Sequence, residues 1–412
     1  MSIKKYLNKG FFLAILIFIA IAFVIYLNLN KAPEKANKAN AQGNTNGITD
    51  TEIIIGSSSA LTGHASFLGT QYTHGSLAYI NEINAKGGIH GRKIKLITYD
   101  DQYDPAKTVA NTQKLILEDK VFILFDYVGT PTSVKIIDMV DEANVPLLGL
   151  FTGAEELRTP FRPYIFNIRA SYYQETEAAV DYFVKKLNFK KIAVFYQDDA
   201  FGLAGLRGVE IALNKYKLKP IATGTYVRGT EDVEKGWKII NGPHPEVIIM
   251  IGTYSPLAKY VKLCKEQGHS HYFHSVSFVG ADAFALELSK SGINTSEKII
   301  VTQVVPDPYE KSEVYLTAVN NYRHLSAKYF PEDKPNYVGL EGYINALILV
   351  EVLNEAGKEL NRDKFIRTIE SLKAYSVGIG MPATYGHNNH QAFNRVYFSH
   401  LSNKKFLLFD PE

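Results

Sequence analysis

The chain has 412 residues, 46% of them hydrophobic and 21% charged, which suggests two or three domains of ~150 residues and excludes a wholly disordered, collagenous or coiled-coil protein. The chain has 45 basic and 42 acidic residues, and residues 1–47 contain six of the basic and one of the acidic ones. The remaining 39 basic and 41 acidic residues nearly balance, so the body lacks the concentrated positive charge of a nucleic-acid-binding protein. The single cysteine excludes an internal disulfide and a multi-cysteine metal centre.

Residues 1–30 predict a signal sequence or a membrane anchor helix. Residues 11–27 carry no charge, and a helix needs ~20 apolar residues, with a range of ~17–25, to cross a bilayer. Three lysines precede this run, so the positive-inside rule places the rest of the chain outside the cytosol. Ala39-Asn40-Ala41 offers a cleavage site, and both a cleaved signal and an uncleaved anchor stay open. Residues 31–47, without an aromatic side chain, predict a flexible linker.

The body begins near residue 48 and alternates short apolar runs with amphipathic stretches. Strands are predicted at 53–56, 93–99, 121–125 and 146–150, separated by helices at about 72–83, 105–117 and 132–143. The helix at 105 opens with Asp104 as its N-cap and Pro105 at its first position.

The same alternation restarts after Arg169. Strands are predicted at 192–196, 222–226, 247–251 and 276–279, with helices at 203–216, 232–240 and 255–266. Helical stretches at 312–329 and 338–356 and a strand-like segment at 395–409 follow. Two successive β/α sets predict two doubly wound α/β lobes, because parallel strands need crossover helices.

Ligands of open α/β sheets bind beyond the carboxyl ends of the strands. The loops predicted there are rich in hydroxyl groups, glycine and aromatic residues and poor in charge; they are 57–63, 126–133, 151–153, 198–202, 253–254 and 281–282. Such a mixture suits a small polar ligand with an apolar body.

The sequence gives little support to an enzyme or a metalloprotein. No nucleophile elbow or P-loop occurs in it, so a hydrolase on a similar frame has no signature. The histidines at 269, 271 and 274 and at 387 and 390 lack the helical spacing and neighbouring carboxylate of a zincin motif. We therefore predict no metal, no cofactor and no catalysis.

Four segments carry a family resemblance. They are Ala60-Leu61-Thr62-Gly63, the run INAKGGIHGRKI at 83–94, Tyr99-Asp100-Asp101 with Asp104-Pro105, and Val145-Pro146-Leu147-Leu148. Together they resemble the type I periplasmic solute-binding proteins of ABC transporters, in the branched-chain amino acid (Leu/Ile/Val) group. The resemblance implies two parallel-sheet lobes joined by three crossover strands. One lobe would hold residues 48–170 and 304–375, and the other residues 171–303 and 376–412.

The resemblance also implies which residues of the first lobe bind the ligand. Hydroxyl and backbone groups would hold the ligand carboxylate at Thr130, with its neighbour Thr132, and at Phe151, Thr152 and Gly153. The two threonines near 130 would equally serve as helix caps, and Phe151 as core.

In the second lobe, the matching positions are Asp282 for a ligand amine and Tyr254 and Phe201 for aromatic contacts. Phe201 lacks the hydroxyl of the family's tyrosine, and Asp282 is one methylene shorter than the family's glutamate. Two alternatives stay open: Asp282 caps a helix that starts near Ala283, and the two aromatic residues only pack between the lobes.

The function implied by the resemblance is that of a non-enzymatic, extracytoplasmic receptor. It would capture an amino acid or a related small carboxylate by hinge closure and deliver it to the permease of an ABC importer. The alternative is a membrane-tethered module that senses its ligand for a signalling partner, which residues 1–47 suggest.

Overall fold

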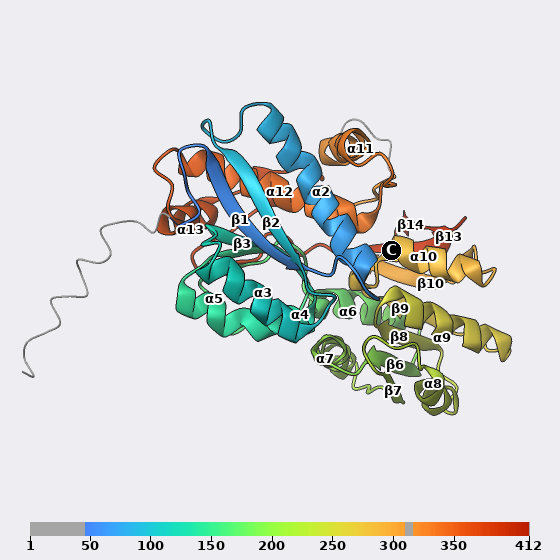
Figure 1. The fold of residues 1–412 in the computed structure, drawn as a ribbon. Coiled ribbons are helices and arrows are strands. Elements are labelled where there is room, and N and C mark those ends of the chain that lie inside the picture. Colours follow the sequence, from blue (N-terminus) through green and yellow to red (C-terminus); the bar gives the residue numbers. More distant parts are fainter. Residues whose placement is uncertain (1–45, 310–315, 412) are drawn as a thin grey trace, which may run out of the picture. The chain divides into compact units, whose positions relative to one another are not determined.

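The computed structural model describes residues 46–309 and 316–411 (Figure 1). The described residues belong to the unit Thr45–Glu412. The helix predicted at 1–30 and nearly all of the predicted linker therefore lie outside the described residues. Within the described ranges, no helix is long and apolar enough to cross a membrane.

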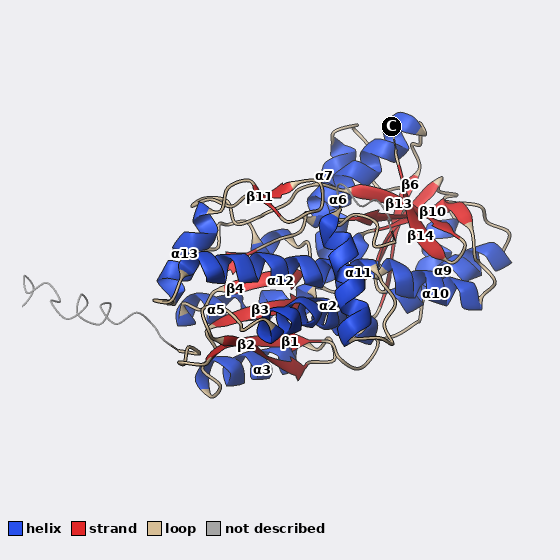
Figure 2. Cartoon of the chain, turned by 90° about the horizontal axis from the view of Figure 1, so that it is seen from above, coloured by secondary structure: helices blue, strands red, loops and turns tan. Residues whose placement is uncertain are grey.

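Five parallel strands form one sheet, which with its helices we call lobe 1. Their order is β2-β1-β3-β4-β5, and their bounds are Lys93–Asp100 (β2), Glu52–Ser59 (β1), Ile123–Val128 (β3), Leu147–Phe151 (β4) and Ile165–Phe166 (β5). One face is covered by α2 (Ser66–Ala85), α11 (Thr317–Tyr329), α12 (Tyr337–Ala356) and α13 (Arg362–Ser371), and the other by α3 (Pro105–Leu117), α4 (Thr130–Ser133) and α5 (Ile137–Ala143) (Figures 1 and 2). Strands β3 and β4 are buried along their whole length, as parallel strands between two helical layers are.

Seven strands form the sheet of lobe 2, in the order β14-β13-β10-β9-β8-β6-β7. Their bounds are Lys405–Phe409 (β14), Tyr397–Ser402 (β13), Ser296–Gln303 (β10), Tyr272–Ser275 (β9), Val247–Ile251 (β8), Ile192–Gln197 (β6) and Thr223–Tyr226 (β7). Its helices are α6 (Tyr172–Asp181), α7 (Ala200–Asn214), α8 (Glu234–Asn241), α9 (Tyr254–Glu266) and α10 (Ala281–Lys290). The β13–β14 edge is antiparallel, which the sequence did not predict. Asn403 and Lys404, with φ of 48° and 64°, form the tight hairpin turn that reverses the chain there.

Three chain crossings join the lobes in the described part of the protein. The chain passes from β5 to α6, returns after β10 to form α11–α13, and crosses again through the short β11 (Tyr375–Ser376) and β12 (Pro382–Ala383) to β13. The first and third crossings pair with each other, because Asn167 N donates to His390 O at 2.7 Å and Ala392 N to Asn167 O at 3.0 Å. We call this pairing the hinge. The two-lobe parallel α/β fold with three crossings confirms the fold class predicted from the sequence.

Local sequence signals account for most element boundaries, with one error that matters for the site. Asp104 accepts a hydrogen bond from Ala106 N at 2.7 Å and begins α3 where predicted. The strand predicted at 276–279 is wrong: β9 is Tyr272–Ser275, and Ser277–Val279 is a 3-10 turn that ends at Gly280, with φ of 71°. Residues 276–279 are apolar enough for a strand, but the neighbouring strands β8 and β10 pair with residues 272–275 instead. The sequence did not predict β10.

Helices α2 and α12 touch through their backbones. A Cβ atom on Gly75 would lie 1.9 Å from Gly339 O, and one on Gly342 would lie 2.1 Å from Tyr72 O. Only glycine permits such an approach, so these residues set how closely the helices pack over the lobe 1 sheet.

Candidate functional site

Two threonine hydroxyls meet where neighbouring strands of lobe 1 end. Thr130 begins α4 directly after β3, and Thr152 follows β4, so the order of the sheet brings them together. Their Oγ1 atoms lie 2.6 Å apart, and both side chains are buried. We call these residues the hydroxyl pair.

Thr132 lies one step further into α4, and its hydroxyl is engaged locally. It donates to Gly129 O at 2.9 Å and to Val128 O. This bond to the preceding backbone stabilises the start of the short helix and draws the Thr132 hydroxyl away from the hydroxyl pair.

Gly153 connects the hydroxyl pair to the start of α6. Tyr172 N donates to Gly153 O at 2.7 Å, and a Cβ atom on Gly153 would lie 2.5 Å from that nitrogen. Burial raises the pKa of Tyr172 to about 12, although Arg169 and the hydroxyl pair lower it, so its hydroxyl keeps its proton at neutral pH. Among the described residues, none accepts from or donates to that hydroxyl in good hydrogen-bond geometry. One threonine of the hydroxyl pair donates to the other, so the second threonine hydroxyl and the Tyr172 hydroxyl are the two donors left for a carboxylate.

Aromatic rings from both lobes pack against one another next to Tyr172. Phe201, at the start of α7, lies 5.3 Å from the Tyr172 ring and 4.5 Å from Phe278, measured between ring centroids. Phe278 lies in turn 5.2 Å from Phe151 at the end of β4. All four rings are buried. The contact of Phe151 with Phe278 spans the two lobes, so it forms only when they are together.

A buried ion network lies behind the aromatic rings. Arg169, on the first crossing, is within 3.3 Å of Glu175 and 3.5 Å of Glu341, and its guanidinium carbon lies 5.0 Å from the centroid of the Phe151 ring. Glu175 also accepts from Ser277 N and Thr302 Oγ1, both at 2.8 Å. Burial raises the pKa of Glu341 to about 7 and also raises the pKa of Glu175, although Arg169 lowers both.

Tyr254 lies in an interlobe contact of its own. Its ring in α9 is 6.3 Å from the ring of Phe67 in α2, in an edge-to-face arrangement. Beside it, Leu68 packs so closely on Gly280 that a Cβ atom there would lie 2.5 Å from Leu68 Cδ2. The structure gives Tyr254 an interlobe packing contact, and its contact with a ligand stays a prediction.

Asp282 does not lie with the hydroxyl pair. It is in the first turn of α10, and its carboxylate accepts from Tyr337 N at 3.0 Å and from the Tyr309 hydroxyl. The capping alternative is not seen either, because Asp282 contacts the start of α12 and not the start of its own helix, where Gly280 is the N-cap. Its contact with a ligand amine stays a prediction, one that would require these two hydrogen bonds to break.

Three residues of the site were missed in the sequence. Phe278 lies in the strand wrongly predicted at 276–279. The strand in fact ends at Ser275, which places Ser277 and Phe278 in the loop at its carboxyl end, where ligands are expected. Tyr172 follows the first crossing, where a short strand precedes the Ser171 N-cap of α6, and Ser171 with Gln174 forms a capping box that the sequence carries. Arg169 was not predicted, because one of its two carboxylate partners, Glu341, is distant along the chain, and nothing in the sequence marks the nearby Glu175 as the other.

The histidines form no metal site in the part of the chain that the structure describes, where no group of three or more potential ligands gathers. His271 binds Pro245 O and Asn241 at 2.7 Å each. His390 contacts Arg162 O at 3.0 Å and Glu370 at 3.2 Å at the hinge.

Curated proteins of two bacteria resemble this chain. An "Amino acid binding protein" of Pseudomonas aeruginosa is 28% identical over 236 residues, 57% of this chain and 63% of that protein. The "Leu/Ile/Val-binding protein" of Escherichia coli K12 is 20% identical over 261 residues, 63% of this chain and 69% of that protein. The match to the first thus spans less than two thirds of its length.

Solved structures share the fold and, in one case, clear sequence similarity. A possible leucine/isoleucine/valine-binding protein from Rhodopirellula baltica SH 1 is 34% identical, with a TM-score of 0.82 over 88% of this chain and 97% of that one. A branched chain amino acid ABC transporter protein from Thermus thermophilus with bound valine has a TM-score of 0.79 at 17% identity, over 88% and 96%, which shows the fold alone. The periplasmic binding protein family matches residues 52–405, which confirms the resemblance: the chain belongs to this family, in the type I group that includes the Leu/Ile/Val-binding proteins.

Proposed function

We propose that this protein captures a small carboxylate, such as an amino acid, between its lobes outside the cytosol and delivers it to an ABC importer without chemical change. The observation that carries the proposal is the hydroxyl pair next to the unpartnered, buried hydroxyl of Tyr172. A carboxylate accepts up to about four hydrogen bonds, so it would satisfy both the threonine hydroxyl that does not donate within the pair and the Tyr172 hydroxyl.

Hinge closure supplies the mechanism. The ligand carboxylate docks on Thr130 and Thr152 of lobe 1, and Phe201 and Phe278 of lobe 2 then cover its apolar body. Because the second set of contacts forms only in the closed state, the ligand favours closure by its differential contacts with the two states. The importer would recognise the closed form.

The proposal is tested by a thermal-shift screen of the full chain against amino acids and simple carboxylates. A ligand at 100 times its dissociation constant stabilises a protein by about 2.7 kcal/mol, which is a visible shift. Thr130→Val removes one hydroxyl and preserves shape, and we expect it to weaken binding at least about tenfold, the equivalent of ~1.4 kcal/mol.

Thr112→Val is the matched control. Thr112 is also buried in lobe 1, but its hydroxyl donates to Thr108 O at 2.7 Å, within α3. Equal loss of affinity in both variants, or no stabilisation by any compound of the panel, contradicts the proposal. Isolation of a permease with the chain supports delivery to an importer; isolation of a signalling protein supports the sensing alternative.

A further inference from the structure

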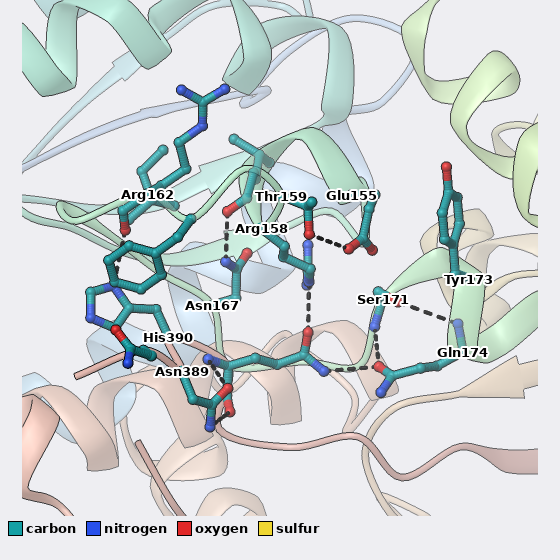
Figure 3. A pocket seen from close by; sticks show the side chains of 15 residues that line it. Glu155, Arg158, Thr159, Arg162, Asn167, Ser171, Tyr173, Gln174, Asn389 and His390 are labelled. Carbon is teal, nitrogen blue, oxygen red and sulfur yellow. Dashed lines mark hydrogen bonds between the residues drawn. The ribbon is translucent and has the colours of Figure 1, made fainter. Parts of the chain in front are cut away.

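A cavity of about 410 Å³ lies at the hinge (Figure 3). Its walls come from residues 155–167 of lobe 1, from the first turn of α6, and from residues 388–391 of the third crossing. The residues proposed above to hold the transported ligand do not line it. Its volume lies near the lower end of the range of small-molecule pockets.

Arg158 places a guanidinium group on the wall of this cavity. Its guanidinium donates to Gln391 Oε1 at 2.8 Å, to Ala154 O at 2.8 Å and to Arg169 O at 3.2 Å, all neutral acceptors. Three of its five N–H groups are thus used, and two remain. Arg158 forms no ion pair among the described residues, although the charges of Glu155 and Glu175 act on it, and burial lowers the pKa of Arg158 to about 10. A partly buried charge in this position is stabilised by an anion.

The other charged groups on the walls are already engaged. Arg162 lies 3.6 Å from Asp141, so its charge is largely matched. Glu155 accepts from the Thr159 hydroxyl at 2.9 Å and carries a negative charge on the Arg158 side of the cavity. This carboxylate disfavours a doubly charged ligand more than a singly charged one.

Asn167 adds an unused acceptor. Its Nδ2 donates to Leu157 O at 3.0 Å, while its Oδ1 is buried and has no partner among the described residues. The residue is 2% exposed, and Figure 3 shows its side chain between Arg158 and His390. A buried carbonyl oxygen without a donor costs about 1–3 kcal/mol, which a ligand hydroxyl would offset.

The position of Arg158 is fixed by a chain of hydrogen bonds across the hinge. Gln391, which accepts from Arg158, donates through Nε2 to Gln174 Oε1 at 2.8 Å. Gln174 also accepts from Ser171 N at 2.8 Å in the capping box of α6. The guanidinium is therefore preorganised for a ligand.

We infer that the hinge cavity is a second ligand site, which binds a small hydroxycarboxylate: the carboxylate pairs with Arg158, and the hydroxyl donates to Asn167 Oδ1. A phosphate monoester with a free hydroxyl also offers an anion and a hydroxyl, but the second negative charge of its phosphate would face Glu155. The site shares no lining residue with the hydroxyl pair and does not depend on which ligand is transported.

Titration of the full chain, labelled with 15N-arginine, tests the site with three probes. Lactate carries both groups, propionate lacks only the hydroxyl, and glycerol 3-phosphate replaces the carboxylate. We expect the Arg158 Nε–H resonance to shift saturably with lactate and at least about tenfold more weakly with propionate. Equal binding of lactate and propionate, tighter binding of glycerol 3-phosphate, or no shift with any probe overturns the inference.

Two variants separate this site from the cleft and from the surface. Arg158→Lys keeps the positive charge but loses the planar guanidinium, which can bind a carboxylate through two N–H groups. We expect at least about tenfold weaker lactate binding by calorimetry. Arg207→Lys, an exposed arginine of α7 that pairs with Glu210 at 3.6 Å, is the matched control and should bind lactate as the unchanged protein does. Thr130→Val should leave the Arg158 response intact; loss of that response would place lactate in the cleft and overturn the inference. Should Arg158→Lys fail to fold, the three titrations of the unchanged chain still decide.

Discussion

The carboxylate of Asp282 accepts a hydrogen bond from the backbone amide of Tyr337, 3.0 Å away. Asp282 lies in the first turn of α10 of lobe 2, and Tyr337 is the first residue of α12 of lobe 1. The Tyr309 hydroxyl donates to the other carboxylate oxygen. An acid of one lobe thus satisfies an amide at the start of a helix of the other, a place where a helix leaves its amides without internal partners.

The burial of the Asp282 carboxyl group makes the stability of the fold depend on pH. Burial raises the pKa of Asp282 from 3.8 to about 6, even though its two hydrogen bonds lower it. The folded state therefore binds the proton more tightly than the unfolded state. The stability that results is fully present below pH ~4 and is lost as the pH rises from about 4 to about 6, by at most about 3 kcal/mol, since one pKa unit is worth ~1.4 kcal/mol.

Asp282→Asn should remove this part of the pH dependence. The asparagine can accept from Tyr337 N and donate to the Tyr309 oxygen, so the contact survives without a charge. We expect urea unfolding free energies at pH 4 and pH 7 to differ less in the variant than in the unchanged protein. Asp50→Asn, at an exposed acid, should show the unchanged difference. The interpretation fails if both variants behave alike.

Phe278 should control the resting position of the hinge. Its ring lies 5.2 Å from the ring of Phe151 of lobe 1, so its removal takes away a contact that exists only when the lobes are closed. Phe278→Leu is expected to increase the radius of gyration of the ligand-free protein in small-angle X-ray scattering. Phe284→Leu, at a ring stacked 5.8 Å from Phe406 inside lobe 2, should lower stability without that increase. An identical scattering profile for all three proteins would falsify the role given to Phe278.

The sequence predicts those structural features that depend on residues close together along the chain. The Asp104-Pro105 pair is enough to begin α3, and the order of apolar runs is enough to bring Thr130 and Thr152 to one edge of a parallel sheet. The surroundings of Asp282 could not be predicted, because they are made by Tyr309 and Tyr337, 27 and 55 residues further along the chain. Tertiary contacts of this kind also decided that the apolar run at 276–279 is a turn.

Arg169 should be essential to the fold because it serves two buried carboxylates. Arg169→Met leaves Glu175 and Glu341 buried without their cation, and loss of one partner of a buried ion pair costs about 3–5 kcal/mol. Guanidinium unfolding should show a loss of this size. Adding Glu341→Gln removes one of the two carboxyl groups, which without Arg169 must stay charged without a cation or take up a proton on folding, and should recover part of the loss at pH 8. No recovery in the double variant would show that the arginine acts through packing on Phe151 instead.

Gly342→Ala should separate α2 from α12. Alanine is favoured over glycine in a helix by about 1 kcal/mol, but the added Cβ would lie 2.1 Å from Tyr72 O, closer than any real contact. Overpacking of this kind costs about 1–3 kcal/mol, so thermal unfolding should show a net loss of stability.

Gly242→Ala is the matched control: Gly242 follows α8 with φ of −56°, and its nearest neighbour, Lys238 O, would lie 3.9 Å from the new Cβ. There the same substitution should stabilise the protein slightly, by about 0.4–1 kcal/mol, because it restricts the unfolded chain. Equal and small effects at both positions would show that the two helices move apart without cost, and that their glycine contact does not set the spacing over the lobe 1 sheet.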